Sequence, residues 1–161
     1  MAIREVLTFP APILKERARE ASPTEAEAAL ADLHDTMRAH HRCVGIAAPQ
    51  IGIPLRIALV DISAHPHGSN SHGMIELVNP EVTFSSEGTK VSREGCLSLP
   101  DLTANVRRPR KATIETRGST YEVSGFEARC VLHEIDHLDG ILFLDRVASV
   151  TDDIFRREDP A

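Results

Sequence analysis

The segment SGFEARCVLHEIDHLDG, from Ser124 to Gly140, carries the strongest structural signal in the chain. Its apolar residues leave an α-helix with hardly any polar face, which predicts a helix that is largely buried. Ser124, followed three residues later by Glu127, is a capping-box signature, and Gly140 stands where such a helix would end. We therefore expect this helix to lie inside the protein.

Two histidines and a glutamate occupy one turn of this segment. Residues four apart lie on the same side of a helix, so His133 and His137 point the same way, with Glu134 beside them. The H-E-x-x-H spacing indicates a divalent metal held by both imidazoles, with the glutamate as general base. A lone histidine on an apolar face is more often a core residue, and so short a pattern also arises by chance. The rest of the chain must therefore supply a third ligand and a place for substrate.

The composition is that of an ordinary globular protein. The chain has 161 residues, 42% of them hydrophobic and 26% charged, which is the size and balance of one domain, 1–161, with a short tail from about 147. Its net charge of −6 argues against a basic nucleic-acid footprint. No apolar run approaches the roughly 20 residues of a membrane span, and the N-terminus does not resemble a signal or transit peptide. We expect a cytoplasmic protein without a membrane or direct nucleic-acid partner, and three reduced cysteines.

The order of the predicted elements indicates the fold class. A first helix starts at Ser22 with Glu25 as its capping partner and runs to about His41. The other predicted elements are a buried strand over 55–62, a polar surface loop over 65–73, strand over 75–84 with a break at Asn79-Pro80, and a hairpin over 112–123 turning at Arg117-Gly118. We predict an α+β fold: small antiparallel or mixed β-sheets around the central buried helix, with an N-terminal helix. The last dozen residues are expected to be loosely attached.

The third metal ligand is left open by the residues themselves. A catalytic metal usually has three protein ligands and one open position. Cys130 is on the same helix but lies about 10.5 Å along the axis from the second histidine, so we interpret it as a small buried residue. Cys43 and Cys96 remain, both in glycine-bearing loops. Cys96 is favoured only slightly, because Gly95 frees the backbone beside it.

Three motifs resemble those of a known family. VGIAAPQIG (44–52), EGCLSLP (94–100) and HEIDHLDG (133–140), in that order, closely resemble the motifs of the peptide deformylases, and the likeness extends from residue 3 to about 146. The resemblance implies an enzyme that removes the formyl group from N-formylated nascent peptides and releases formate. It implies a metal held by Cys96, His133 and His137. Fe²⁺ is the metal that the family implies, with Zn²⁺ or Ni²⁺ able to replace it, whereas ligand softness alone favours zinc.

The resemblance also implies roles for residues outside the metal site. Glu134 moves the proton, and the oxyanion is held by the side-chain amide of Gln50 and the backbone N–H of Leu97. Without the motif, Gln50 would be interpreted as an exposed loop residue. The implied substrate-binding residues are Gly45, Ile46, Gly95 and Phe126. For Gly45 the alternative interpretation is ordinary loop packing. Glu94 and Arg107 are interpreted either as surface residues or as a structural ion pair.

Some features depart from the family pattern. Cys43 stands where glycine is common, Leu132 where glutamine is frequent, and the C-terminal tail is no long basic helix of the kind that docks on ribosomes in some members. Any ribosome contact is thus expected to be transient. Two alternatives remain, an H-E-x-x-H metallopeptidase and a deformylase-like protein with altered substrate specificity.

Overall fold

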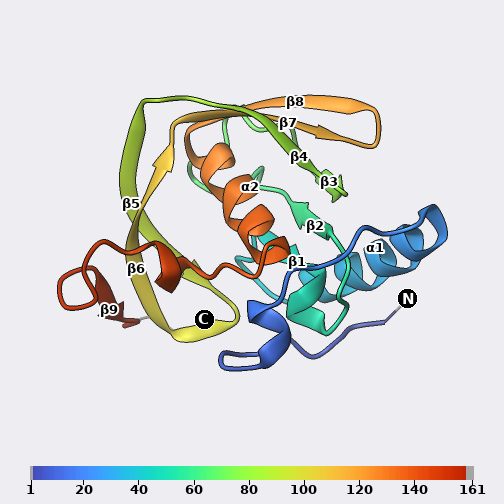
Figure 1. Ribbon diagram of the computed structural model, residues 1–161, viewed down its shortest axis with the longest axis horizontal. Helices are drawn as coiled ribbons and strands as arrows, with labels where there is room; N and C mark the ends of the chain where they lie inside the picture. The colour runs from blue at the N-terminus through green and yellow to red at the C-terminus, as the bar shows by residue number, and fades with distance from the viewer. Residues whose placement is uncertain (1, 159–161) are drawn as a thin grey trace.

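The computed structural model describes residues 2–158. Within these residues there are two α-helices, α1 (Pro23–Arg38) and α2 (Gly125–Leu138). Helix α2 lies in the middle of the molecule, with strands on either side of it, and α1 lies at one end (Figure 1). No helix of the described part is both long and apolar enough to cross a membrane.

The strands form three small sheets. The first contains β1 (Gly45–Ala47), β2 (Ile57–Val60) and β3 (Ile75–Val78) in that order. The second has the order β4 (Glu81–Ser85), β7 (Lys111–Thr116), β8 (Ser119–Ser124), and the third β5 (Thr89–Cys96), β6 (Leu99–Pro109), β9 (Ile154–Arg156). All of these pairings are antiparallel. Three short 3-10 helices complete the elements: η1 (Pro12–Lys15), η2 (Ala48–Ile51) and η3 (Phe143–Arg146). The predicted α+β fold around a buried helix is confirmed.

Helix α1 begins as the sequence predicts. The Ser22 side chain accepts a hydrogen bond from the backbone N–H of Glu25 at 3.2 Å, and the Glu25 carboxylate accepts one from the backbone N–H of Ser22 at 2.9 Å. This reciprocal capping box provides acceptors for two backbone N–H groups at the start of the helix, where no preceding turn offers a carbonyl. The helix ends at Arg38, earlier than the predicted His41.

Helix α2 is buried as predicted, but its start differs from the prediction. Ser124 is the N-cap residue and its side chain makes no capping hydrogen bond. The Glu127 carboxylate instead accepts hydrogen bonds from the backbone N–H of His72 at 2.8 Å and from its Nδ1 at 2.6 Å. The prediction of a capping box at Ser124 was therefore wrong, because a distant loop offers the buried Glu127 carboxylate two hydrogen-bond donors. That contact also ties the loop over 65–73 to the helix.

The predicted turns are confirmed. Asn79 has a φ of 48° and separates β3 from β4, which accounts for the break in the strand pattern. Arg117 and Gly118 have φ angles of 49° and 77°, the two positive values that a tight antiparallel hairpin turn requires. The buried strand over 55–62 is shorter than predicted and covers Ile57–Val60.

Packing around the first sheet positions the site. The apolar side of α2 packs against β2, β3, β7 and β8 in one core cluster, and α1 packs against β1, η2 and β2 in another. Strand β1 pairs with β2 along one edge only, because it is the outer strand of its sheet. Its other edge has no strand beside it among the described residues.

The C-terminal segment differs from the expected loose tail. Strand β9 pairs with β6, so that Leu102 lies opposite Arg156 and Ala104 opposite Ile154. The Ile154 side chain packs against the third core cluster. Residues 153–157 are therefore held by the sheet. Residues 159–161 of the expected tail lie outside the described part of the chain.

Candidate active site

Three residues predicted as metal ligands come together in the structure. His133 and His137 lie one turn apart on α2, and Cys96 ends β5 at an irregularity in its pairing with β6. One ligand atom of each residue lies within 4.8 Å of the other two, and Cys96 Sγ is 3.3 Å from Nε2 of His137. Within residues 2–158, this is the one group of His, Cys, Asp or Glu side chains with such a spacing. A thiolate and two imidazoles form a donor set that fits a divalent transition metal with one position left open.

The other two cysteines are unsuited to metal binding. Burial, assisted by the nearby Glu134, raises the pKa of the Cys43 thiol to about 12. Burial raises the pKa of Cys130 as well, with Glu134 again contributing. Both thiols therefore stay protonated near neutral pH, whereas the thiolate is the form that binds metal. Cys130 is buried as predicted and lies outside the group of three.

A buried carboxylate orients one of the histidines. Nδ1 of His133 donates to Glu94 at 2.8 Å, which leaves Nε2 for a metal. Glu94 also accepts hydrogen bonds from Arg108 at 2.6 and 3.0 Å and from Arg129 at 2.6 Å. Burial alone would raise the pKa of Glu94, but His133 and Arg108 hold it well below its usual range. The carboxylate is thus ionised and fixed in place.

The arginine that β6 contributes to this network is Arg108 and not Arg107. Arg107 is exposed and donates to the Thr89 side chain. On β6 the even-numbered residues from Ala104 to Arg108 face the core, so the alternation of the strand places Arg108 beside Glu94. That alternation was the signal in the sequence that could have identified it.

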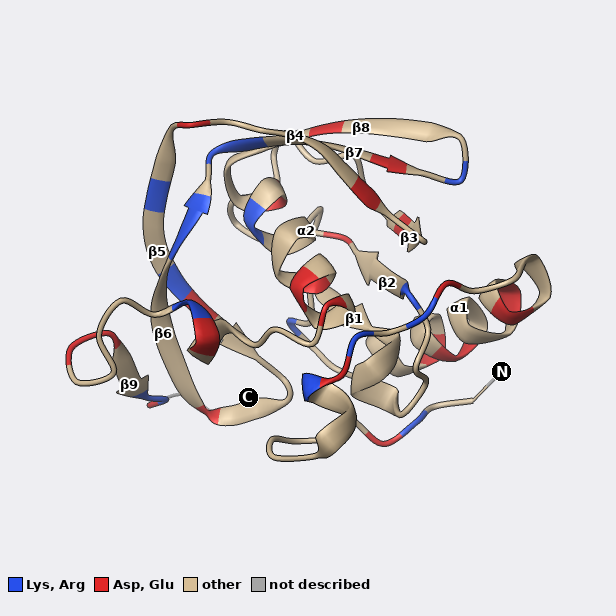
Figure 2. Cartoon of the chain, in the orientation of Figure 1, with Lys and Arg blue, Asp and Glu red and all other residues tan. Residues whose placement is uncertain are grey.

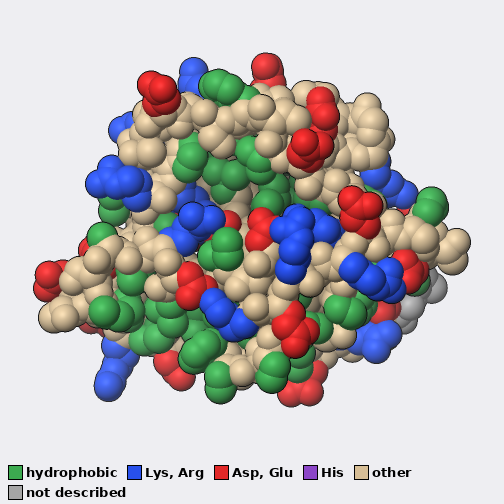
Figure 3. Space-filling view, in the orientation of Figure 1, with side chains coloured by type: hydrophobic (Ala, Val, Ile, Leu, Met, Phe, Trp, Pro, Cys, Tyr) green, Lys and Arg blue, Asp and Glu red, His purple; other side chains and the backbone are tan. Residues whose placement is uncertain are grey.

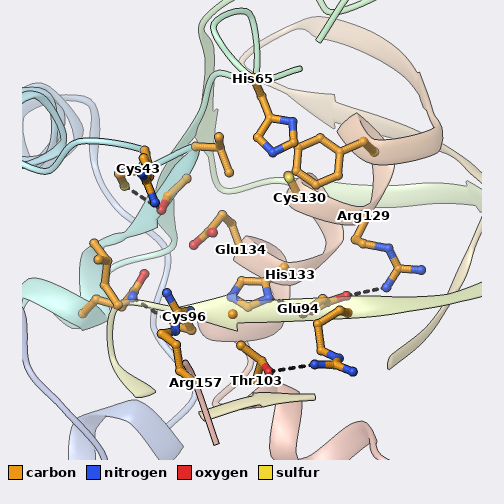
Figure 4. Close-up of a pocket in the computed structure, with 18 of the residues that line it drawn as sticks. Cys43, His65, Glu94, Cys96, Thr103, Arg129, Cys130, His133, Glu134 and Arg157 are labelled. Carbon is orange, nitrogen blue, oxygen red and sulfur yellow. Dashed lines mark hydrogen bonds and ion pairs between the residues drawn. The ribbon is translucent and has the colours of Figure 1, made fainter. Parts of the chain in front are cut away.

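Glu134 lies beside the cluster with one oxygen unpartnered. It is buried, and within the described residues its Oε1 has no hydrogen-bond partner. Burial raises the pKa of Glu134 to about 7, although His133 and Arg108 act in the opposite direction. A Cβ built on Gly45 would lie only 2.6 Å from Oε2 of Glu134, so the carboxylate packs directly on the β1 backbone. Figure 4 shows Glu134 between Cys43 and His133, facing the cavity.

Gln50 is buried, so its interpretation as an exposed loop residue was wrong. Its Oε1 accepts a hydrogen bond from the backbone N–H of Ala47 at 2.9 Å. Its Nε2 donates to Ser98 Oγ at 3.1 Å and lies 3.5 Å from Cys96 Sγ. The amide group of Gln50 is therefore held next to the candidate ligand.

These groups border one large cavity of about 920 Å³. The predicted site residues that line it are Gly45, Gln50, Gly95, Cys96, Leu97, Phe126, His133 and Glu134. Two predicted residues do not line it. His137 is buried in the candidate metal group, and the fully buried side chain of Ile46 packs in the core with α1. The sequence analysis missed His65, whose ring stacks on Phe126 with centroids 4.3 Å apart, and Arg157.

A buried H-E-x-x-H helix, a cysteine as the candidate third ligand and a cavity beside them define a class, the α+β metal-dependent hydrolases. The sequence pattern of the polypeptide deformylase family matches residues 3–153. A peptide deformylase from Bartonella tribocorum is 36% identical to the chain, and the match covers 98% of the chain and 92% of that protein. A peptide deformylase from Heliobacterium modesticaldum is 40% identical, and the match covers 91% of the chain and 95% of that protein. The chain belongs to the polypeptide deformylase family.

Solved structures agree with this assignment. A class I type b peptide deformylase from Acinetobacter baumannii, bound to Met-Ala-Ser, superposes with a TM-score of 0.80 at 33% identity, over 91% of this chain and all of that one. A peptide deformylase from Legionella pneumophila gives a TM-score of 0.79 at 36% identity, over 92% of this chain and 88% of that one.

Proposed function

We propose that this protein is a deformylase that hydrolyses the formyl amide at the N-terminus of nascent formyl-methionyl polypeptides. The observation that carries the proposal is the position of Glu134, buried beside the group of Cys96, His133 and His137 and facing a large cavity. A purely structural metal site would need no unpartnered carboxylate beside it. Membership of the deformylase family supports the same reaction.

The residues of the site divide the chemistry among them. When bound by Cys96, His133 and His137, a divalent ion supplies a water of lowered pKa and polarises a carbonyl oxygen. Glu134 takes a proton from the water that attacks the formyl carbon. It then gives this proton to the amine nitrogen as the carbon–nitrogen bond breaks, which yields formate and a free amino terminus.

The oxygen of the formyl group gains negative charge during the attack and needs fixed donors. We infer that the Gln50 amide and the backbone N–H of Leu97 provide them. Gln50 is held for this role by the backbone N–H of Ala47 and by Ser98. Leu97 follows Cys96 directly and lines the cavity.

The peptide is expected to bind as an added strand. The unpaired edge of β1 offers backbone groups at Gly45 and Ile46, and Gly95 lies on the cavity wall formed by β5. The contribution of Ile46 is thus its backbone and not its side chain. Phe126 and His65 form an aromatic surface at one end of the cavity, which suits a methionine side chain.

We propose Fe²⁺ as the native metal, with Zn²⁺ or Ni²⁺ able to replace it. Family resemblance supports iron, whereas the softness of the thiolate and imidazole donors by itself favours zinc. Elemental analysis of protein purified without oxygen distinguishes the two. Iron-loaded protein should lose activity in air through oxidation at its thiolate-bound metal, while zinc-loaded protein should be slower and stable in air.

The reaction is expected to take place in the cytoplasm, where nascent chains emerge. We infer a single catalytic domain, since α2 contacts strands of all three sheets and the family pattern matches residues 3–153 as one stretch. Any contact with the ribosome should be transient, because residues 154–156 form a strand rather than part of a long basic helix.

Formate release tests the function. The metal-loaded protein should release formate from formyl-Met-Ala-Ser and leave acetyl-Met-Ala-Ser and casein intact. Digestion of casein would indicate an H-E-x-x-H peptidase instead. Formate release from other formylated peptides but not from this one would indicate altered specificity.

A further inference from the structure

The C-terminal segment is fixed against the wall of the cavity. In the pairing of β9 with β6, Phe155 lies opposite Thr103, and beyond the strand the backbone N–H of Arg157 donates to the carbonyl of Asp101 at 2.8 Å. The Arg93 guanidinium lies 3.6 Å from the centroid of the Phe155 ring, a cation–π contact that links β5 to β9. The position of Arg157 is therefore set by the sheet.

The guanidinium of Arg157 lies on Gly95, the residue before the candidate ligand Cys96. A Cβ built on Gly95 would be 2.0 Å from Nη2 of Arg157, so the guanidinium occupies space that only glycine leaves open. In Figure 4, Arg157 lies beside Cys96, at the opposite end of the cavity from His65. The cavity thus has an aromatic end and a cationic end, with the candidate metal site between them.

Within residues 2–158, the arginines near this end of the cavity form no ion pair with a carboxylate, although Glu158 lines the same cavity. Arg157, Arg42 and Arg156 all line the cavity, and within residues 2–158 none of the three forms an ion pair. The Nε of Arg157 is buried and has no hydrogen-bond partner among the described residues. Basic side chains near the end of α2, on the face shown in Figure 3, are instead paired with carboxylates.

The distribution of charge makes this end unusual for an acidic protein. Figure 2 shows acidic segments on α1, β7 and β8, and basic segments on β5 and β6 as well as at the turn between β7 and β8. Against a net charge of −6, the guanidinium of Arg157 on the cavity wall at Gly95 provides a local attraction for an anion. A guanidinium binds a carboxylate through two parallel hydrogen bonds, and partial burial strengthens that interaction.

We propose that Arg157, next to the charge of Arg156, forms a subsite for a carboxylate of the substrate. Its ligand is an acidic side chain at the second or third residue of a formylated peptide. An extended peptide advances about 3.3 Å per residue, so these residues follow the wall formed by Gly95 once the formyl group is at the candidate metal site. This proposal rests on the proposed function and assigns to the enzyme a preference among nascent chains.

The test compares acidic peptides with neutral isosteres. Formyl-Met-Glu-Ala and formyl-Met-Ala-Glu, both amidated at the C-terminus, are compared with the corresponding glutamine peptides on enzyme with equal metal loading. The variants are Arg157→Gln, Arg157→Lys and the control Arg110→Gln. Arg110 is an exposed arginine that bonds the carbonyl of Thr89 and does not line the cavity.

The parent enzyme should favour one glutamate peptide over its glutamine partner by about tenfold in kcat/KM, mainly through KM, as expected for a charge-assisted hydrogen bond. Added salt should reduce the preference. Arg157→Gln should remove it, so that kcat/KM becomes equal for the glutamate peptide and its glutamine partner. Arg157→Lys should keep part of the preference, and Arg110→Gln all of it.

Equal kcat/KM for acidic and neutral peptides in the parent, or a preference that survives Arg157→Gln, would overturn the subsite. If Arg157→Gln does not fold, the proposal is still tested by the effect of salt on the parent's preference for the glutamate peptide and by the preference of the Arg157→Lys variant. Turnover of the glutamine peptides tests the deformylase function separately, because those peptides carry no carboxylate.

Discussion

Nδ1 of His133 donates a hydrogen bond to the buried carboxylate of Glu94 at 2.8 Å. The same carboxylate is held by Arg108 and Arg129, so the imidazole is oriented by a network that reaches from α2 to β5 and β6. A ligand fixed in this way needs no further ordering when a metal binds. The metal site and the core of the protein are therefore coupled.

Glu94→Gln should weaken metal binding by about 10- to 100-fold, because the ionised acceptor for His133 is lost. Chelator competition on the purified protein measures this affinity. Glu87→Gln is the matched control, since Glu87 is exposed in the loop before β5. Equal metal affinities for the two variants would show that Glu94 does not position the histidine.

Glu134→Gln should keep the metal and lose deformylation by about 10²- to 10⁴-fold, the usual effect of removing a general base. The amide has nearly the same shape but cannot accept the proton. Metal content and formate release are measured on the same preparation. Near-normal turnover, or loss of the metal in proportion to activity, would exclude the proposed role.

Cys96→Ala should abolish metal binding under native conditions, whereas Cys130→Ala should not. Cys96 Sγ belongs to the group whose ligand atoms lie within 4.8 Å of one another, and Cys130 does not. Elemental analysis of both variants gives the comparison. Metal retained by the Cys96 variant would mean that another residue is the third ligand.

Gly45→Ala should lower kcat by about a hundredfold without unfolding the protein, because a displaced catalytic group costs that much. The new methyl group would lie 2.6 Å from Oε2 of Glu134 and must push the carboxylate aside. Gly88→Ala serves as the control, since the nearest atom to its Cβ would be 3.9 Å away. If both variants kept full kcat, Glu134 would not need its contact with β1.

Cys43→Gly should raise kcat/KM on formyl-Met-Ala peptides by about tenfold. Cys43 lines the cavity, and its Sγ donates to the carbonyl of Gly45 at 3.2 Å, a group that the substrate backbone is expected to need. Cys43→Ala separates two causes, since it removes the thiol but keeps the Cβ. An unchanged or lower value in both variants would leave Cys43 as a packing residue.

Local patterns in the sequence were sufficient for several features. The spacing of His133 and His137 placed both on one side of a buried helix, and Arg117-Gly118 marked a hairpin turn. These features follow from the 3.6-residue period of a helix and from the φ angles of a tight turn, so neighbouring residues determine them. The order of three motifs also identified the family.

Tertiary structure alone decided which distant groups meet. The motif resemblance had already implied Cys96 as a ligand. The approach of Cys96 to the two histidines, the pairing of Glu94 with Arg108 and the placement of Arg157 on Gly95 each join strands and helices far apart in the chain. The Ile46 side chain turned into the core, because β1 has the cavity along one edge and α1 against one face. Periodicity tells which residues share a face, but the packing of three sheets around α2 determines what that face contacts.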